Sequence, residues 1–145
     1  MRWLAMVAAF GFAACGGMSL DGSVNEQAPL EFNDVVMRKQ SQTFLLQYQH
    51  RTGEAAQIVL KLAVDIEAMP PSKELRGDDF LEHVSVSRVT HDGTRFPPIR
   101  HGSFVFERLK FEHRGPANGY FAILFSDSTT VNGTFGGTLT EVVEE

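Results

Sequence analysis

Cysteine and tryptophan are almost missing from this 145-residue chain, which has one of each, Cys15 and Trp3. A single cysteine excludes a disulfide framework within the chain and any zinc site built from cysteine pairs. Past Gly17 there is also no apolar run approaching the roughly 20 residues that a membrane-spanning helix needs. Tyr48 and Tyr120 are the only tyrosines, which disfavours a surface that binds sugars by aromatic stacking.

Positive charge is also in short supply. The chain has 13 Lys and Arg residues against 18 Asp and Glu residues, which gives a formal net charge of −5 with histidine neutral. Nucleic-acid binding calls for a basic patch, and charge-driven attachment to lipid calls for a polybasic segment. The charge balance therefore predicts no nucleic-acid partner, and any membrane attachment must come from another source.

The motifs of common catalytic and metal sites are absent as well. The chain contains no HxH, HExxH, CxxC, DxDxDG or GxSxG pattern, and the stretch Gly133–Gly137 lacks the lysine of a phosphate loop. We expect the acidic residues Glu74, Asp78, Asp79 and Glu82 in a solvated loop. The five histidines are expected at the surface near strand ends (His50, His83, His91, His101 and His113). These absences predict no cofactor, no metal site and no catalytic residue.

One strand is expected to carry a concentration of polar side chains. His83 and His91 should lie on the polar face of the segment Glu82–Thr90, with Ser85 and Ser87 between them. Serine and histidine on one face are compatible with hydrolysis, but no nucleophile elbow accompanies them. A structural role for both serines is therefore expected.

The N-terminus is the first stretch with a clear character of its own. Arg2 supplies a positive charge, and Trp3–Ala14 is an uncharged, mostly apolar run of 12 residues. The run is too short to span a bilayer and is typical of a secretory signal peptide, which is removed from the mature protein. A buried N-terminal helix is the alternative, but the run is apolar on every side and leaves no polar face for water.

The residues Phe12-Ala13-Ala14-Cys15 resemble the lipobox of bacterial lipoproteins, in which an apolar residue and two small residues precede a cysteine. Leucine is usual where this chain has Phe12. The resemblance implies cleavage before Cys15, a diacylglyceryl group on its sulfur and acylation of the new amino terminus. Lipidation also accounts for a single cysteine in an exported chain, and two or more acyl chains give stable attachment to a membrane.

This resemblance divides the chain into three parts. Residues 1–14 would be the cleaved signal peptide, residues 15–19 the lipidated Cys15 with a short tether, and residues 20–145 a single domain. In Gram-negative lipoproteins an aspartate after the cysteine commonly retains the protein at the inner membrane. Gly16 stands there in this chain, which implies the outer membrane, facing the periplasm or the cell surface.

Beyond the tether, apolar and polar residues alternate with a period of two, which predicts β-strands. The expected strands, about eight in all, are Ser19–Val24, Leu30–Arg38, Gln42–Gln49, Ala56–Ile66, Glu82–Thr90, His101–His113, Tyr120–Phe125 and Thr130–Leu139. Ser126–Thr129 should join the last two as a hairpin, and the change of faces along His101–His113 requires a bulge near Glu107. Turns are predicted at His50–Gly53, His91–Thr94 and Gly115–Gly119, and Leu75–Leu81 is expected to be irregular.

Many short strands, frequent turns and no strong helix predict an all-β fold, either an antiparallel β-sandwich or a partly open barrel. Ten phenylalanines, from Phe32 to Phe135, should fill its core. The stretches SLDGSV, FNDVVMRK, HGSFVFERL and VNGTFGGTL resemble a group of small, uncharacterised Gram-negative lipoproteins with β-sandwich domains. That resemblance implies a fold and no activity.

These observations favour a lipid-anchored cell-envelope protein, bound to the membrane through Cys15, whose domain has a non-enzymatic interaction or structural role. One alternative is a periplasmic small-ligand-binding or inhibitor module that uses loops such as Pro70–Leu81 and Thr94–His101. A hydrolase with an unrecognised site is the other. Converging histidine and acidic side chains in a pocket would favour the hydrolase, an apolar cavity the ligand binder, and flat polar faces the interaction role.

Overall fold

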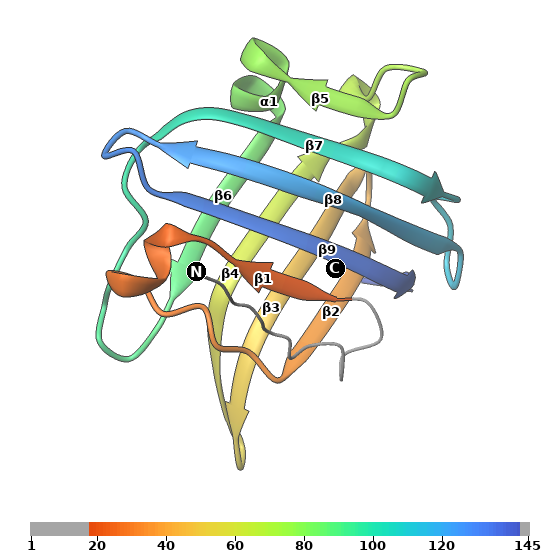
Figure 1. The fold of residues 1–145 in the computed structure, drawn as a ribbon. Coiled ribbons are helices and arrows are strands. Elements are labelled where there is room, and N and C mark those ends of the chain that lie inside the picture. The colour runs from red at the N-terminus through yellow and green to blue at the C-terminus, as the bar shows by residue number, and fades with distance from the viewer. Residues whose placement is uncertain (1–17, 143–145) are drawn as a thin grey trace, which may run out of the picture.

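The computed structural model of this chain describes residues 18–142, which form two facing sheets of five strands each (Figure 1). The first sheet has the strand order β1-β9-β8-β7-β5, and the second has the order β10-β2-β3-β4-β6. Within the described part of the chain no strand belongs to both sheets, so the fold is a β-sandwich rather than a partly open barrel. The strands are β1 (Ser19–Asp21), β2 (Asp34–Gln40), β3 (Thr43–Thr52), β4 (Ala55–Asp65), β5 (Glu74–Arg76), β6 (Val84–Val89), β7 (Ile99–Leu109), β8 (Pro116–Phe125), β9 (Thr130–Thr138) and β10 (Thr140–Glu141).

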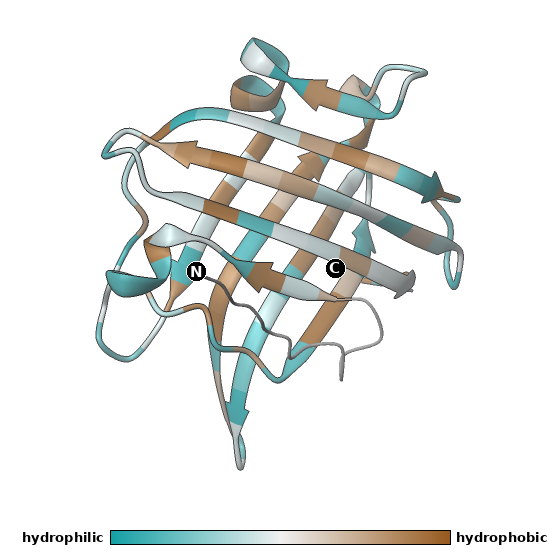
Figure 2. Cartoon of the chain, viewed as in Figure 1, coloured by the Kyte–Doolittle hydropathy of each residue, from teal (hydrophilic) through white to brown (hydrophobic). Residues whose placement is uncertain are grey.

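Aromatic side chains fill the space between the two sheets. Phe44 on β3 reaches across to Phe106 on β7 and Phe135 on β9, with ring centroids 5.0 and 5.6 Å apart. The Tyr48 hydroxyl on β3 crosses the same space and donates a hydrogen bond of 2.7 Å to the Thr134 carbonyl on β9. Hydrophobic and hydrophilic residues alternate along the strands, as Figure 2 shows, because successive side chains point to opposite faces of a sheet.

Two local predictions in the C-terminal half are confirmed. β8 and β9 form the predicted hairpin around residues 126–129, and their register runs without a shift. β7 carries a bulge between Phe106 and Arg108, where Glu107 was expected to be the extra residue. After the bulge, the partly buried Leu109 packs against the core in place of Arg108, which is exposed.

The predicted strand Leu30–Arg38 begins too early. β2 starts at Asp34, whereas the Leu30 amide donates to the Asn25 side chain at 2.8 Å and takes no part in the ladder. Ala28 and Leu30 are buried in the hydrophobic core. Their apolar side chains therefore reflect a loop that packs on the core rather than a strand. A 3₁₀ helix, Ser23–Glu26, follows β1 where the first predicted strand was expected to continue.

The irregular connection predicted for Leu75–Leu81 is wrong. Residues Glu74–Arg76 form β5 at the edge of the first sheet, and Gly77–His83 form helix α1, which lies beside β5 in Figure 1. Phe80 is fully buried over Gly102 of β7, where a Cβ atom would overlap the Phe80 ring. Phe80 therefore packs on a glycine that is distant in the sequence, and no local pattern indicates this contact.

Two predicted turns are displaced along the chain and overlap the observed turns only in part. β3 continues to Thr52, so the turn falls at Gly53 and Glu54. β8 begins at Pro116, and the preceding turn occupies residues 110–115. Gly119 lies inside β8, and a Cβ atom at this position would overlap the Val105 carbonyl oxygen of the neighbouring strand β7. This glycine therefore permits close approach of two strands rather than a turn.

The sheets contain two short strands beyond those expected, β5 and β10. β10 pairs with β2 in parallel, whereas every other recorded strand pair is antiparallel. A second 3₁₀ helix, Ile66–Ala68, follows β4. Across residues 18–142, none of the helices has the length and apolar character to cross a membrane.

Candidate functional site

Cys15, the predicted lipidation site, lies outside the described residues 18–142. Its lipidation therefore stays a prediction. β1 begins at Ser19, so the sandwich starts four positions after this cysteine.

The histidines do not converge on one site. His83 is the last residue of α1, and His91 lies in the turn after β6, so the prediction that both share one face of a strand is wrong. Ser85 and Ser87 do lie on β6 and are exposed. Among residues 18–142 neither serine has a hydrogen bond to a histidine or a carboxylate, so the strand carries no nucleophile with an oriented base.

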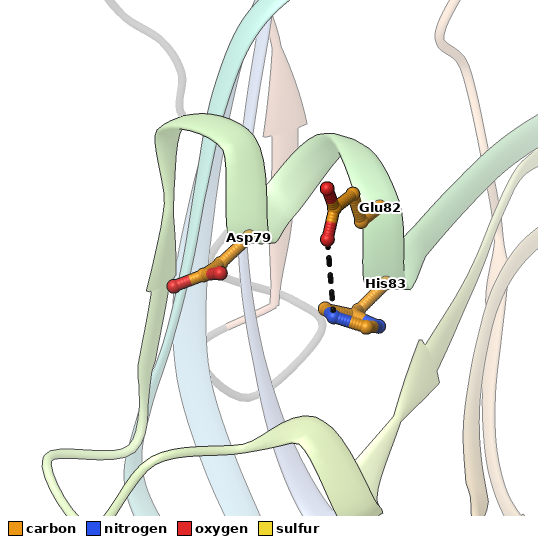
Figure 3. Close-up of side chains that lie close together, drawn as sticks. All are labelled: Asp79, Glu82 and His83. Atoms are coloured by element: carbon orange, nitrogen blue, oxygen red, sulfur yellow. Dashed lines mark ion pairs between the residues drawn. The ribbon is translucent and has the colours of Figure 1, made fainter.

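Of the acidic residues expected in a loop, Glu74 lies on β5, whereas Asp78, Asp79 and Glu82 lie on helix α1. Asp78 and Asp79 occupy the first turn of that helix. Negative charge is favoured there because the free N–H groups at the start of a helix carry partial positive charge. Figure 3 shows the side chains of Asp79, Glu82 and His83 on α1. The possible ligand atoms of these three residues lie within 4.8 Å of one another. The His83 ring nitrogens lie 3.7 Å from Glu82 and 3.8 Å from Asp65. Three surface donors fall short of the four ligands that close a structural zinc site.

A larger feature lies where edge strand β6 meets the connection that leads to β7. This groove has a volume of about 550 Å³. We call it the β6–β7 groove, and it is lined by Leu81, Val86, Ser87, Arg88, Arg95, Phe96, Pro97, Pro98, Ile99 and Phe125. Its walls come from both sheets and from the end of α1.

The connection between β6 and β7 is shaped by an aromatic stack. Phe96 lies face to face with the buried Phe125 at the end of β8, with ring centroids 5.3 Å apart and planes 10° from parallel. Pro97 and Pro98 follow, and they keep the chain out of the ladder because proline cannot donate a backbone hydrogen bond. The chain therefore stands away from β6 and leaves the groove between them.

Arg88 is one of the polar residues that line the groove. Its Nε donates to the Thr94 hydroxyl at 3.0 Å, and its Nη1 donates to the carbonyls of Pro29 at 2.8 Å and Val59 at 3.3 Å. The guanidinium also lies over the Phe96 ring, 5.6 Å from its centroid. Burial lowers the pKa of Arg88, and the negative charge of Asp92 acts in the opposite direction.

Comparison with known proteins gives no match. No family model, no curated protein and no solved structure is significantly similar to this chain. The chemistry of the β6–β7 groove must therefore be argued from its own residues.

A smaller, polar recess of about 190 Å³ shares Arg88 with the groove. Its walls include Glu31, His50 and Asp92. The buried His50 Nδ1 has no hydrogen-bond partner within residues 18–142. Asp92 accepts hydrogen bonds from the Thr90 hydroxyl and from the Thr94 amide and hydroxyl. These hydrogen bonds, that of Thr90 first, lower the pKa of Asp92 to about 2. Histidine and carboxylates thus line one recess, but the described residues include no hydrogen bond or ion pair between them.

Sequence reasoning found part of the β6–β7 groove and missed its centre. The loop Thr94–His101 contributes five lining residues, whereas Pro70–Leu81 contributes Leu81 alone. Arg88 was not singled out, since nothing in its neighbourhood on β6 indicates contacts with Pro29 and Val59. Tyr48 is buried in the core and Tyr120 is 43% exposed, so no paired tyrosine platform exists.

Proposed function

We propose that this protein is a lipid-anchored cell-envelope protein whose β-sandwich has a non-enzymatic binding role. The lipobox-like residues Phe12–Cys15 and the apolar run before them support the anchor. The attachment would be a thioether-linked diacylglyceryl group on Cys15, with an acyl chain on the new amino terminus. Gly16 supports a position at the outer membrane, facing the periplasm or the cell surface.

The β6–β7 groove is the observation that carries the binding role. Its volume of about 550 Å³ lies within the range of roughly 300–1,000 Å³ that is usual for small-molecule sites. Leucine, valine, phenylalanine, proline and isoleucine make up most of its lining. A concave, mostly apolar surface with a few polar groups is the general form of a ligand site, and this favours a small ligand over a partner that needs a flat face.

A hydrolase is the weaker proposal. The polar recess holds His50 beside two acidic residues, but hydrolysis also needs an activated nucleophile within hydrogen-bond reach of a base. Thr90 is the hydroxyl residue of that recess, and its Oγ1 donates to Asp92 at 2.6 Å. The geometry of the described residues therefore supports binding more directly than catalysis.

The anchor is tested by replacing the sulfur. Wild-type chain should incorporate a labelled fatty acid in the cell, and Cys15→Ser should not, because serine offers no thiol for the diacylglyceryl group. Gly17→Ser is the matched control, since it adds a hydroxyl nearby and keeps Cys15, and it should label like the wild type. Equal labelling of Cys15→Ser and wild type would overturn the anchor.

The binding role is tested with an uncharged apolar probe, N-phenyl-1-naphthylamine, whose fluorescence rises in apolar surroundings. Both sheets and the whole core lie within residues 18–142, so residues 15–145 with Cys15→Ser provide the mature chain without attached lipid. Saturable binding should weaken several-fold in Leu81→Ser, which alters the groove. Val89→Ser is the control, because Val89 is 65% exposed on β6 and lies outside the groove. No saturable binding, or equal loss in both variants, would contradict a binding groove.

A further inference from the structure

The charge of the β6–β7 groove is opposite to that of the chain. The protein has a formal net charge of −5, yet the charged residues that line the groove are Arg88 and Arg95. Among residues 18–142, no acidic side chain lines it. A ligand that enters this groove therefore meets positive charge beside an apolar wall.

Both arginines have N–H groups that donate no hydrogen bond to any described residue. Arg88 uses Nε and Nη1 for its hydrogen bonds, and within residues 18–142 its Nη2 has no hydrogen-bond partner and the guanidinium has no ion pair. Arg95 is exposed and has neither a hydrogen bond nor an ion pair with any described residue. A guanidinium presents its N–H groups in a planar fork that matches the two oxygens of a carboxylate.

The apolar part of the groove is open to solvent in the free protein. Leu81 is 44% exposed, and it is one of three large hydrophobic residues exposed among the described residues, with Val89 and Tyr120. Phe96 and Ile99 are only partly buried. Covering these side chains with an alkyl chain would remove apolar surface from water, which favours binding in proportion to the area covered.

We infer that the β6–β7 groove binds a long-chain carboxylate, a single-chain amphiphilic anion of the fatty-acid type. The alkyl chain would lie against Leu81 and Phe96, and the carboxylate would accept hydrogen bonds from Arg95 and from the free edge of Arg88. This inference rests on the proposed binding role and adds to it the chemical class of the ligand. A cationic amphiphile would meet the same apolar wall with the wrong charge at its head.

Isothermal titration of the acyl-free mature chain with sodium dodecanoate, below its micelle concentration, tests the inference. Dodecanoate should bind at one site, 1-dodecanol and dodecylammonium should bind much more weakly, and acetate should show no saturable binding. Arg95→Gln should weaken dodecanoate binding by about three- to tenfold, since a charge-assisted hydrogen bond at a partly solvated site is lost. Arg100→Gln is the control, because Arg100 is exposed on β7 and does not line the groove. Added salt should weaken the wild type more than Arg95→Gln.

The outcomes separate the ligand class from the binding role. If dodecanol binds as tightly as dodecanoate and Arg95→Gln changes nothing, the groove binds apolar molecules and the anionic class is wrong. If dodecyl phosphate binds and dodecanoate does not, the carboxylate assignment is wrong. If no alkyl compound binds and N-phenyl-1-naphthylamine also fails to bind, the proposed binding role falls with the inference.

Discussion

Replacement of Arg88 by methionine tests how much the Arg88 guanidinium contributes to the stability of the folded domain. Arg88 on β6 joins the segment before β2 through Pro29, strand β4 through Val59 and the following turn through Thr94. Methionine keeps a long apolar stem and removes all three hydrogen bonds. It also removes the contact between the positive charge and the Phe96 ring.

The size of the loss follows from these contacts. The two shorter hydrogen bonds contribute about 1 kcal/mol each, the 3.3 Å contact with Val59 contributes less, and the cation–π contact adds about 0.5–1 kcal/mol. Methionine is uncharged, so the variant avoids the free-energy cost of partly burying a positive charge. The same burial lowers the pKa of Arg88 in the wild type. We expect a net loss of about 1–2 kcal/mol, or a fall of about 4–10 °C in the melting temperature of a domain of this size.

Thermal unfolding followed by circular dichroism measures this loss. Arg100→Met is the matched control, because Arg100 is exposed and lacks a hydrogen-bond partner within residues 18–142. Arg88→Lys should fall between wild type and Arg88→Met, since lysine keeps the charge without the planar fork. Equal melting temperatures for Arg88→Met and Arg100→Met would refute the reasoning.

The remaining predictions concern the core, two titrating groups and the α1 cluster. Gly102→Ala should cost about 1–3 kcal/mol in urea unfolding, because its Cβ would overlap the Phe80 ring. Gly136→Ala, whose Cβ would lie 3.5 Å from that of Asn118, should cost clearly less, and equal costs would be contrary to the packing argument. Tyr48→Phe should cost about 1 kcal/mol at neutral pH. Burial raises the pKa of Tyr48, so wild-type stability should fall as pH rises above about 10, where the unfolded phenol ionises, and the variant should lose less over that range. Asp92 has its pKa lowered to about 2, so its contribution is present above about pH 4 and is lost as pH falls toward 2. Stability curves of wild type and Asp92→Asn should therefore converge in acid, and a constant separation would contradict this. Equimolar Zn²⁺ should leave the melting temperature unchanged, whereas a saturable rise that His83→Ala abolishes would reveal a metal site on α1.

The sandwich could be predicted because its signals are local. The β8–β9 hairpin alternates over consecutive residues around a polar turn, and the bulge in β7 follows from the change of face between Phe106 and Leu109. Helix α1 could not be predicted in this way. Its decisive contact is Phe80 against Gly102, two residues on different elements whose proximity depends on the assembled sheets.

The sequence indicated where part of the groove lies but not which polar groups line it. Two prolines in Thr94–His101 indicated a segment that leaves the ladder, and Pro97 and Pro98 do line the groove. Arg88, in contrast, bonds to Pro29 and Val59, which lie 59 and 29 positions away in the chain. The lipidation of Cys15 stays a prediction from the N-terminal motif, since that residue lies outside residues 18–142.

Mapping a ligand onto the folded chain is the most direct test of the groove as the functional surface. The isotopically labelled mature chain with Cys15→Ser would be titrated with dodecanoate and followed by the backbone amide resonances. The largest shifts should fall on Leu81 of α1, Arg88 of β6 and Phe96 of the connection between β6 and β7, which meet in the β6–β7 groove. Shifts concentrated on α1 around His83 or on the outer face of the β8–β9 hairpin, or no shifts at saturating dodecanoate, would contradict the assignment.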